Sequence, residues 1–179
     1  MNTNITRITT ELTDIDNLAT TLWYTGCKLY CNGCQNNHMK EFCKGYDFDT
    51  LKEKLIERRA FTDWIVHTGG NPIDSVDTLI EVATFAKSIG FKQFLFCGYD
   101  EEQMVKLIGE EKNKKLLDLI DYIKVGAYEK SKDKNDFNCS EYHFATLNQQ
   151  VIKPSDNKRH WKTWYSYVPN SPIPKFYLS

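Results

Sequence analysis

The sequence predicts an α/β fold in which helices cover a parallel sheet. Short runs of β-branched and aromatic residues alternate with segments of helical periodicity, and a glycine-containing loop follows four of these runs. No internal repeat, low-complexity tract or Pro/Gly-rich linker interrupts the order. Alternation of this kind is typical of parallel strands joined by helical crossovers.

The predicted elements follow one another along most of the chain. Extended, mostly apolar runs predict strands at Ile5–Leu12, Thr20–Tyr24, Trp64–Thr68, Gln93–Phe96 and Tyr122–Val125. Helical spacing predicts helices at Asp49–Arg59 with Asp49 as the cap, at Ser75–Ser88, and at Glu101–Ile120 as one or two helices. A last extended segment is predicted at Phe144–Ile152, whereas the aromatic-rich stretch Trp161–Tyr177 permits no assignment.

Composition limits the class of protein. The chain has 179 residues, of which 41% are hydrophobic and 26% charged, so we expect one domain over 1–179, with a core at about 20–152 and a tail at 153–179. A formal net charge of −1 gives no electrostatic reason to expect a nucleic-acid partner. Without an apolar leader or a run long enough to cross a bilayer, we expect a cytoplasmic protein with no membrane partner.

Three of the six cysteines fall close together, and without an export signal a disulfide framework is not expected. Cys27, Cys31 and Cys34 form the pattern CxxxCxxC. Thiolates ligate iron–sulfur clusters, and three of them leave one iron of a four-iron cluster open, as a catalytic metal requires. Gly26 and Gly33 let the backbone fold tightly around a bulky cofactor.

Two other interpretations of the cysteines remain open. A zinc site would take its fourth ligand from His38 or Cys43, although no second compact pair of ligands follows. A dithiol redox site would use Cys31 and Cys34.

The unusual residues all follow predicted strands. TGCKLYCNGCQN, GGNP, CGYD and GAYE come after the second, third, fourth and fifth strand in turn. Because ligands bind beyond the carboxyl ends of parallel strands, we expect one site at that edge. Within it, Gly69 and Gly70 bring the backbone close to a ligand, Asn71 adds a polar side chain and Pro72 stiffens the exit.

Taken together, these residues resemble the radical-SAM superfamily, and more closely the activating enzymes of anaerobic (class III) ribonucleotide reductase. The resemblance covers roughly residues 20–152 and rests on the cluster loop Gly26–Asn36, the GGDP-like turn Gly69–Pro72, the TGY-like Cys97–Tyr99, the DGxF-like residues Gly126 and Tyr128, and the SNQ-like element Leu147–Ile152. The chain departs from that pattern at Asn71, where the family has an acid, at Val125, where it has Asp, and at Cys97, where it has Thr or Ser.

The resemblance implies a fold, two cofactors and their contacts. The fold would be a partial (open) TIM-like barrel of βα units, the radical-SAM core. Cys27, Cys31 and Cys34 would hold a [4Fe–4S] cluster whose open iron binds the amino and carboxylate groups of S-adenosyl-L-methionine (SAM). Gly69, Gly70 and Asn71 would hold the methionine amino end. The backbone at Gly33 would pass near the adenine, and Asn36 would be a second polar contact. We expect a side chain at Gly70 to weaken SAM binding and leave iron binding normal.

The resemblance also implies an activity. One electron would split SAM into methionine and a 5′-deoxyadenosyl radical, which would take a hydrogen atom from a glycine of the large subunit of anaerobic ribonucleotide reductase. An electron donor such as flavodoxin would be the second partner. The alternatives are a radical-SAM enzyme acting on a small molecule, such as a deazapurine-forming synthase, and a non-enzymatic zinc-binding module.

Several further residues have two interpretations each. His67 faces the site or is a core histidine bonded to backbone. Cys43 and Cys139 are expected to be incidental buried thiols, and Cys97 a small apolar wall of the site. Tyr99 and Tyr128 line the pocket or pack in the core. The aromatic residues of the tail, Trp161, Trp164, Tyr165 and Tyr167, cover the open side of the fold or face a partner.

Overall fold

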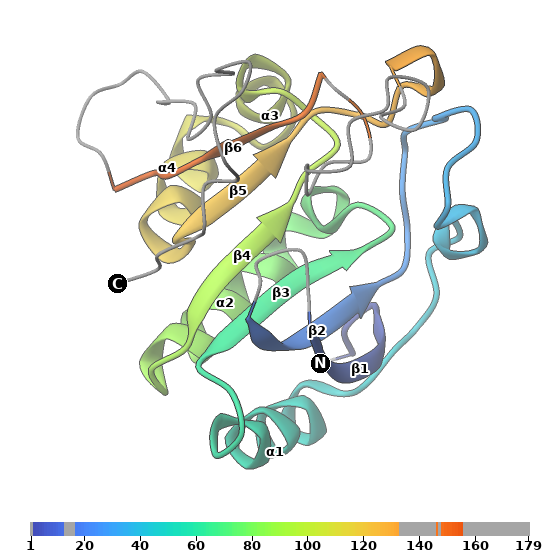
Figure 1. Ribbon diagram of the computed structural model, residues 1–179. Coiled ribbons are helices and arrows are strands. Elements are labelled where there is room, and N and C mark those ends of the chain that lie inside the picture. The colour runs from blue at the N-terminus through green and yellow to red at the C-terminus, as the bar shows by residue number, and fades with distance from the viewer. Residues whose placement is uncertain (1, 13–16, 133–145, 147, 156–179) are drawn as a thin grey trace.

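The computed structural model describes residues 2–12, 17–132, 146 and 148–155, and within them the chain forms a six-stranded sheet with helices (Figure 1). The strands are β1 (Ile5–Leu12), β2 (Leu18–Tyr24), β3 (Trp64–Gly69), β4 (Lys92–Phe96), β5 (Tyr122–Val125) and β6 (Gln150–Ile152). Each strand predicted before the last segment is present, with bounds that differ by at most two residues. Of the extended segment predicted at Phe144–Ile152, the described residues form a strand only from Gln150.

The strands lie side by side in the order in which the chain makes them, from β1 to β6. β2, β3, β4 and β5 are parallel, and β1 and β6 pair antiparallel at the two edges. The four central strands are therefore parallel, as predicted, whereas the sheet as a whole is mixed. Parallel strands in sequential order also occur in a TIM-like barrel. The barrel itself stays a prediction.

The helices connect the parallel strands. They are α1 (Phe48–Arg59), α2 (Val76–Ser88), α3 (Glu101–Ile108) and α4 (Glu110–Leu119), with short 3₁₀ turns η1 (Asn37–Met39), η2 (Pro72–Ser75) and η3 (Lys130–Lys132). The predicted cap Asp49 is wrong, because Asp47 precedes the helix and its carboxylate accepts the Thr50 N–H. Gly109, with φ of 80°, separates α3 from α4 and so divides the segment predicted as one or two helices.

The two faces of the sheet bury different residues. The larger core lies between the sheet and the helices, and its strand residues include Leu22, Ile65 and Leu95. It also contains the buried side chains of the four helices, Leu51, Leu55, Leu79, Ile80, Val82, Ala83, Ala86, Met104 and Leu116. All four helices therefore cover one face of the sheet. The opposite face carries a second cluster made by Ala19, Trp64, Val66, Phe94, Tyr122 and Val151.

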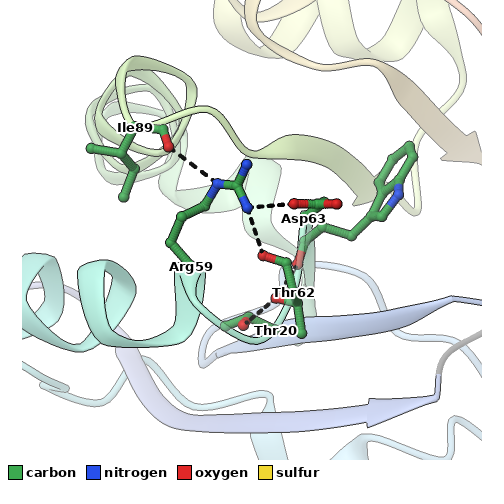
Figure 2. A network of polar contacts seen from close by, with 6 residues as sticks. Thr20, Arg59, Thr62, Asp63 and Ile89 are labelled. Atoms are coloured by element: carbon green, nitrogen blue, oxygen red, sulfur yellow. Dashed lines mark hydrogen bonds and ion pairs between the residues drawn. The ribbon is translucent and has the colours of Figure 1, made fainter.

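A network of polar contacts lies at the amino ends of the strands (Figure 2). Arg59, the last residue of α1, donates to the backbone oxygens of Ile89, at 3.2 Å, and Thr62, at 3.4 Å, and forms an ion pair with Asp63. The Thr62 hydroxyl lies 3.0 Å from that of Thr20 in β2. This network ties a helix to the sheet at the end opposite the unusual loops, so its role is stability.

Two predictions concern the rest of the chain. The aromatic residues of the tail and Cys139 lie outside the described residues. The single domain over 1–179 stays a prediction. Within the described part, no helix is long and apolar enough to cross a membrane.

Candidate functional site

Four loops leave the carboxyl ends of β2, β3, β4 and β5, as the sequence predicts (Figure 1). The first, which we call the cysteine loop, comprises residues 25–36 between β2 and η1. The second runs from Gly70 into η2, the third comprises residues 97–100, and the fourth comprises residues 126–129. Because the four strands are parallel and adjacent, these loops share one edge of the sheet.

The cysteine loop is anchored at its base and open at its tip. The Gly26 and Cys27 amides donate to the backbone oxygens of Met39, at 2.8 Å, and Lys40, at 3.0 Å. A tight turn brings the Cys34 amide to the Cys31 oxygen at 3.3 Å. Gly26 and Gly33 have φ of 94° and 77°, a conformation in which glycine is strongly favoured. Both glycines are therefore required by the shape of the loop.

The three thiols of the loop are half-buried. Burial raises the pKa of Cys27, and the nearby Asp74, Cys31 and Cys34 raise this pKa further, while a backbone contact with Leu29 lowers it. In the described residues, no three Cys, His, Asp or Glu side chains converge closely enough to hold a metal ion. The donor set nevertheless fits an iron–sulfur cluster, because three soft thiol ligands stand on one glycine-shaped loop.

The residues of the zinc alternative lie just beyond the loop. His38 is exposed in η1, and Cys43 is an exposed cysteine rather than the buried one expected. The Cys43 backbone is fixed by Thr25, whose hydroxyl accepts the Cys43 N–H and donates to its carbonyl oxygen. Asn36, predicted to contact SAM, is half-buried immediately before η1, and its carbonyl accepts the Met39 N–H at 2.9 Å.

The glycine pair after β3 lies against the cysteine loop. The Gly70 amide donates to the Tyr24 oxygen at 2.8 Å, and the Asn71 amide to the Gly26 oxygen at 2.9 Å. A Cβ at Gly69 would stand 2.3 Å from the Tyr24 oxygen, and one at Gly70 would stand 2.4 Å from the Gly26 oxygen. A side chain at Gly70 would therefore press on the base of the cysteine loop, so we expect it to disturb iron binding as well as SAM binding.

Asn71 is 2% exposed, and both ends of its amide have partners. Its Nδ2 donates to Asp74 at 3.1 Å, and its Oδ1 accepts the Gly98 N–H at 3.3 Å. Asp74 is a site residue that the sequence analysis missed. The signal was an acid three residues after Asn71, in the turn that follows the glycine pair.

The third and fourth loops complete the edge. Cys97 is buried, as expected of a small wall residue, and burial raises its pKa to about 12. Tyr99 donates its hydroxyl to Asp74 Oδ1 at 2.9 Å, and its pKa is raised by burial and by this bond. Tyr128 lies beside Gly33 and, with Tyr30 and Cys31, lines an open hollow of about 550 Å³ between the cysteine loop and the fourth loop.

The element predicted as SNQ-like supports the fourth loop. Asn148 donates to the Ala127 oxygen at 2.9 Å, and Gln149 donates to the Gly126 oxygen at 3.1 Å. Leu147 lies outside the described residues.

His67 belongs to the core and not to the site, and its partners are side chains rather than the backbone expected. Its Nδ1 lies 3.0 Å from the Tyr24 hydroxyl, and its Nε2 lies 2.9 Å from Gln93 Oε1. Gln93 donates its own amide to the Ala83 and Leu119 oxygens, so Gln93 Oε1 accepts and His67 carries its proton on Nε2. Burial lowers the pKa of His67 to about 4.

The protein is therefore of the α/β class. Its cysteine loop, shaped by glycines, carries three thiols of the kind that bind an iron–sulfur cluster. The profile of the family described as "4Fe-4S single cluster domain" matches residues 17–152, and the chain belongs to that family. It therefore contains a 4Fe–4S cluster-binding domain, which spans β2 to β6. No curated protein sequence matches the chain.

Proposed function

We propose that the chain is a radical-SAM activase, which generates a glycyl radical on the large subunit of anaerobic ribonucleotide reductase. The observation that carries the proposal is CxxxCxxC on the loop after β2, placed against the glycine pair after β3. The family matched by residues 17–152 occurs in radical-SAM-type proteins, which supports the same class.

In this proposal Cys27, Cys31 and Cys34 hold the cluster. When bound and reduced, a [4Fe–4S] cluster supplies the electron that splits the sulfonium C–S bond of SAM into methionine and a 5′-deoxyadenosyl radical. The residues of the chain bind SAM, orient it and exclude water. A hollow of about 550 Å³ beside Cys31 falls in the size range of cofactor sites, so we assign it to the adenosine part of SAM.

The methionine end would lie toward the loop after β3. Because the side chain of Asn71 is occupied by Asp74 and Gly98, we expect the contacts of the methionine amino group to come mainly from backbone at Gly69 and Gly70. A neutral Asn71 gives a weaker contact to an ammonium group than the acid of the family pattern would.

The substrate would enter at the same edge of the sheet. In the proposed reaction the 5′-deoxyadenosyl radical would take a hydrogen atom from a glycine of the partner, which would leave 5′-deoxyadenosine and a glycyl radical. The shape of the site favours a protein substrate, because the hollow beside Cys31 is open and the partner would close it against water.

The first test measures the cluster and SAM cleavage. After anaerobic reconstitution we expect about four irons and four sulfides per chain, a count that defines this cluster type, and formation of 5′-deoxyadenosine on reduction. Cys27→Ala, Cys31→Ala or Cys34→Ala should abolish cleavage. Cys43→Ala is the matched control, because this exposed thiol lies near the loop but outside the motif.

The second test separates a protein substrate from a small molecule. The chain is mixed anaerobically with the cognate reductase, SAM and a reductant, and electron paramagnetic resonance is recorded. A glycyl doublet on the reductase is expected. SAM cleavage without that doublet would reject the activase, and a colourless zinc-loaded protein without iron would reject both radical-SAM alternatives.

A further inference from the structure

One carboxylate joins three of the four loops at the site. Asp74, in η2, accepts the backbone N–H of Lys28 at 2.9 Å with Oδ2. The same Oδ2 accepts Nδ2 of Asn71 at 3.1 Å, and Oδ1 accepts the Tyr99 hydroxyl at 2.9 Å. The donors come from the loops after β2, β3 and β4, and Lys28 directly follows the proposed ligand Cys27.

Asn71 extends this connection. Its Oδ1 accepts the Gly98 N–H at 3.3 Å, and its own backbone N–H donates to Gly26. Asp74 and Asn71 thus hold Lys28 and Gly26, the residues on either side of Cys27. Cys27 has a backbone bond of its own to Lys40, but among the described residues its side chain makes only a long hydrogen bond, to the Leu29 oxygen at 3.8 Å.

We propose that Asp74 is a positioning residue, whose carboxylate fixes the cysteine loop at Lys28 so that the Cys27 thiol faces the cluster. The inference rests on the proposed function, because positioning of Cys27 matters only where a cluster is bound. Asp74 does not itself touch the cluster or SAM in this proposal. Its hydrogen bonds are those of a charged acceptor, which are stronger than bonds between neutral groups.

The same geometry suits an asparagine at residue 71, whose amide donates to Asp74 and accepts from Gly98. An aspartate there would place a second carboxylate about 3 Å from Asp74 Oδ2, where the amide now donates. Two carboxylates at that separation repel each other, and neither can donate a hydrogen bond while both are ionised. An acid at 71 would therefore be unfavourable beside Asp74.

The test follows the Lys28 amide directly. Hydrogen exchange is measured by nuclear magnetic resonance on the full chain without metal, for wild type, Asp74→Ala and Asp74→Asn. We expect exchange at Lys28 to be about tenfold faster in Asp74→Ala, a factor in line with the loss of a bond to a charged acceptor. Asp74→Asn should stay within about threefold of wild type, because its Oδ1 can still accept from Lys28 and Asn71.

A matched variant and a second measurement complete the test. Tyr99→Phe removes one contact of Asp74 but not the one to Lys28, and exchange at Lys28 should be unchanged. After reconstitution, iron should be lost to a chelator faster from Asp74→Ala than from Asp74→Asn, with amides in β2 and β3 equally protected in both. The proposal is overturned if Lys28 exchanges at the wild-type rate in Asp74→Ala, or equally fast in both Asp74 variants.

The test of Asp74 can fail independently of the test of the proposed function. Exchange in the metal-free chain reports whether Asp74 holds the loop, whereas the iron content of wild type reports whether the loop binds a cluster. Wild type that takes up no iron would reject the proposed function even where exchange at Lys28 follows Asp74.

Discussion

Substitution of Gly70 by alanine tests how closely the two central loops of the site depend on each other. Gly70 is not among the glycines with positive φ, so alanine brings no backbone strain there. The Cβ would instead stand 2.4 Å from the Gly26 oxygen and 3.0 Å from the Met39 oxygen. Both neighbours are backbone atoms, which cannot rotate away from the added methyl group.

The magnitude follows from these distances. Cβ contacts below 3.0 Å are essentially never seen, so the loop after β3 and the cysteine loop must separate by at least about 0.6 Å. The separation weakens the bond from the Asn71 N–H to the Gly26 oxygen, now 2.9 Å. Overpacking of this kind costs about 1–3 kcal/mol. We therefore expect a melting temperature lower by several degrees, and a reduced iron content.

Gly98→Ala is the matched control. It also has no positive φ, and its Cβ would meet Leu29 Cδ1 at 2.2 Å, but this atom is the tip of a side chain that can turn away. Thermal unfolding of the metal-free chains and iron content after reconstitution are compared for both variants. If Gly70→Ala melted like Gly98→Ala, took up iron normally and lost only SAM affinity, the reasoning would be refuted.

The remaining predictions concern stability and thiol reactivity. His67 has a pKa of about 4 when folded and 6.5 in the unfolded reference, so protonation favours the unfolded chain. The contribution of neutral His67 to the free energy of unfolding, roughly 3 kcal/mol, is present above pH 6.5 and is lost as pH falls toward 4. Urea unfolding at pH 7 and 4.5 should show this loss in wild type and less of it in His67→Gln. Asp47→Ala should lower the melting temperature by about 2–4 °C because it removes the α1 cap, whereas Asp49→Ala should leave it nearly unchanged. Cys43 should be alkylated at pH 8 in the folded metal-free chain and Cys97 only after unfolding, as mass spectrometry can check; early labelling of Cys97 would contradict its burial and its pKa of about 12.

The sequence predicted the strands and helices because their signals are local. Short β-branched and aromatic runs predicted β2 to β5, and apolar residues at helical spacing predicted α1 and α2 to within a few residues. The cap of α1 was misplaced because two aspartates flank Phe48, and periodicity does not tell which of them precedes the first turn. Element boundaries are thus where local reasoning failed.

Only part of the site was predicted, and the reason differs from that for the element boundaries. Its place at the carboxyl ends of the strands follows from parallel order, which alternation indicates. The roles of Gly70 and Asp74 do not follow, because they depend on distances between loops that are far apart in the chain. Asp74 lies 46 positions from Lys28 and 25 from Tyr99 in the sequence. Local sequence patterns extend over only a few residues, so they do not reveal such contacts.

The relative position of the cysteine loop and the glycine pair depends on the register between β2 and β3. Tyr24 of β2 is the register partner of Gly69 of β3, and the bonds from Gly70 to Tyr24 and from Asn71 to Gly26 continue this pairing past the ends of the strands. A shift of one residue between β2 and β3 would therefore separate the cysteine loop from the glycine pair as well as exchange the buried side chains of the sheet. A ligand that binds both loops would therefore favour this register of the two strands. Any cluster or cofactor that binds only the folded chain must also raise its stability, by an amount set by its affinity and concentration.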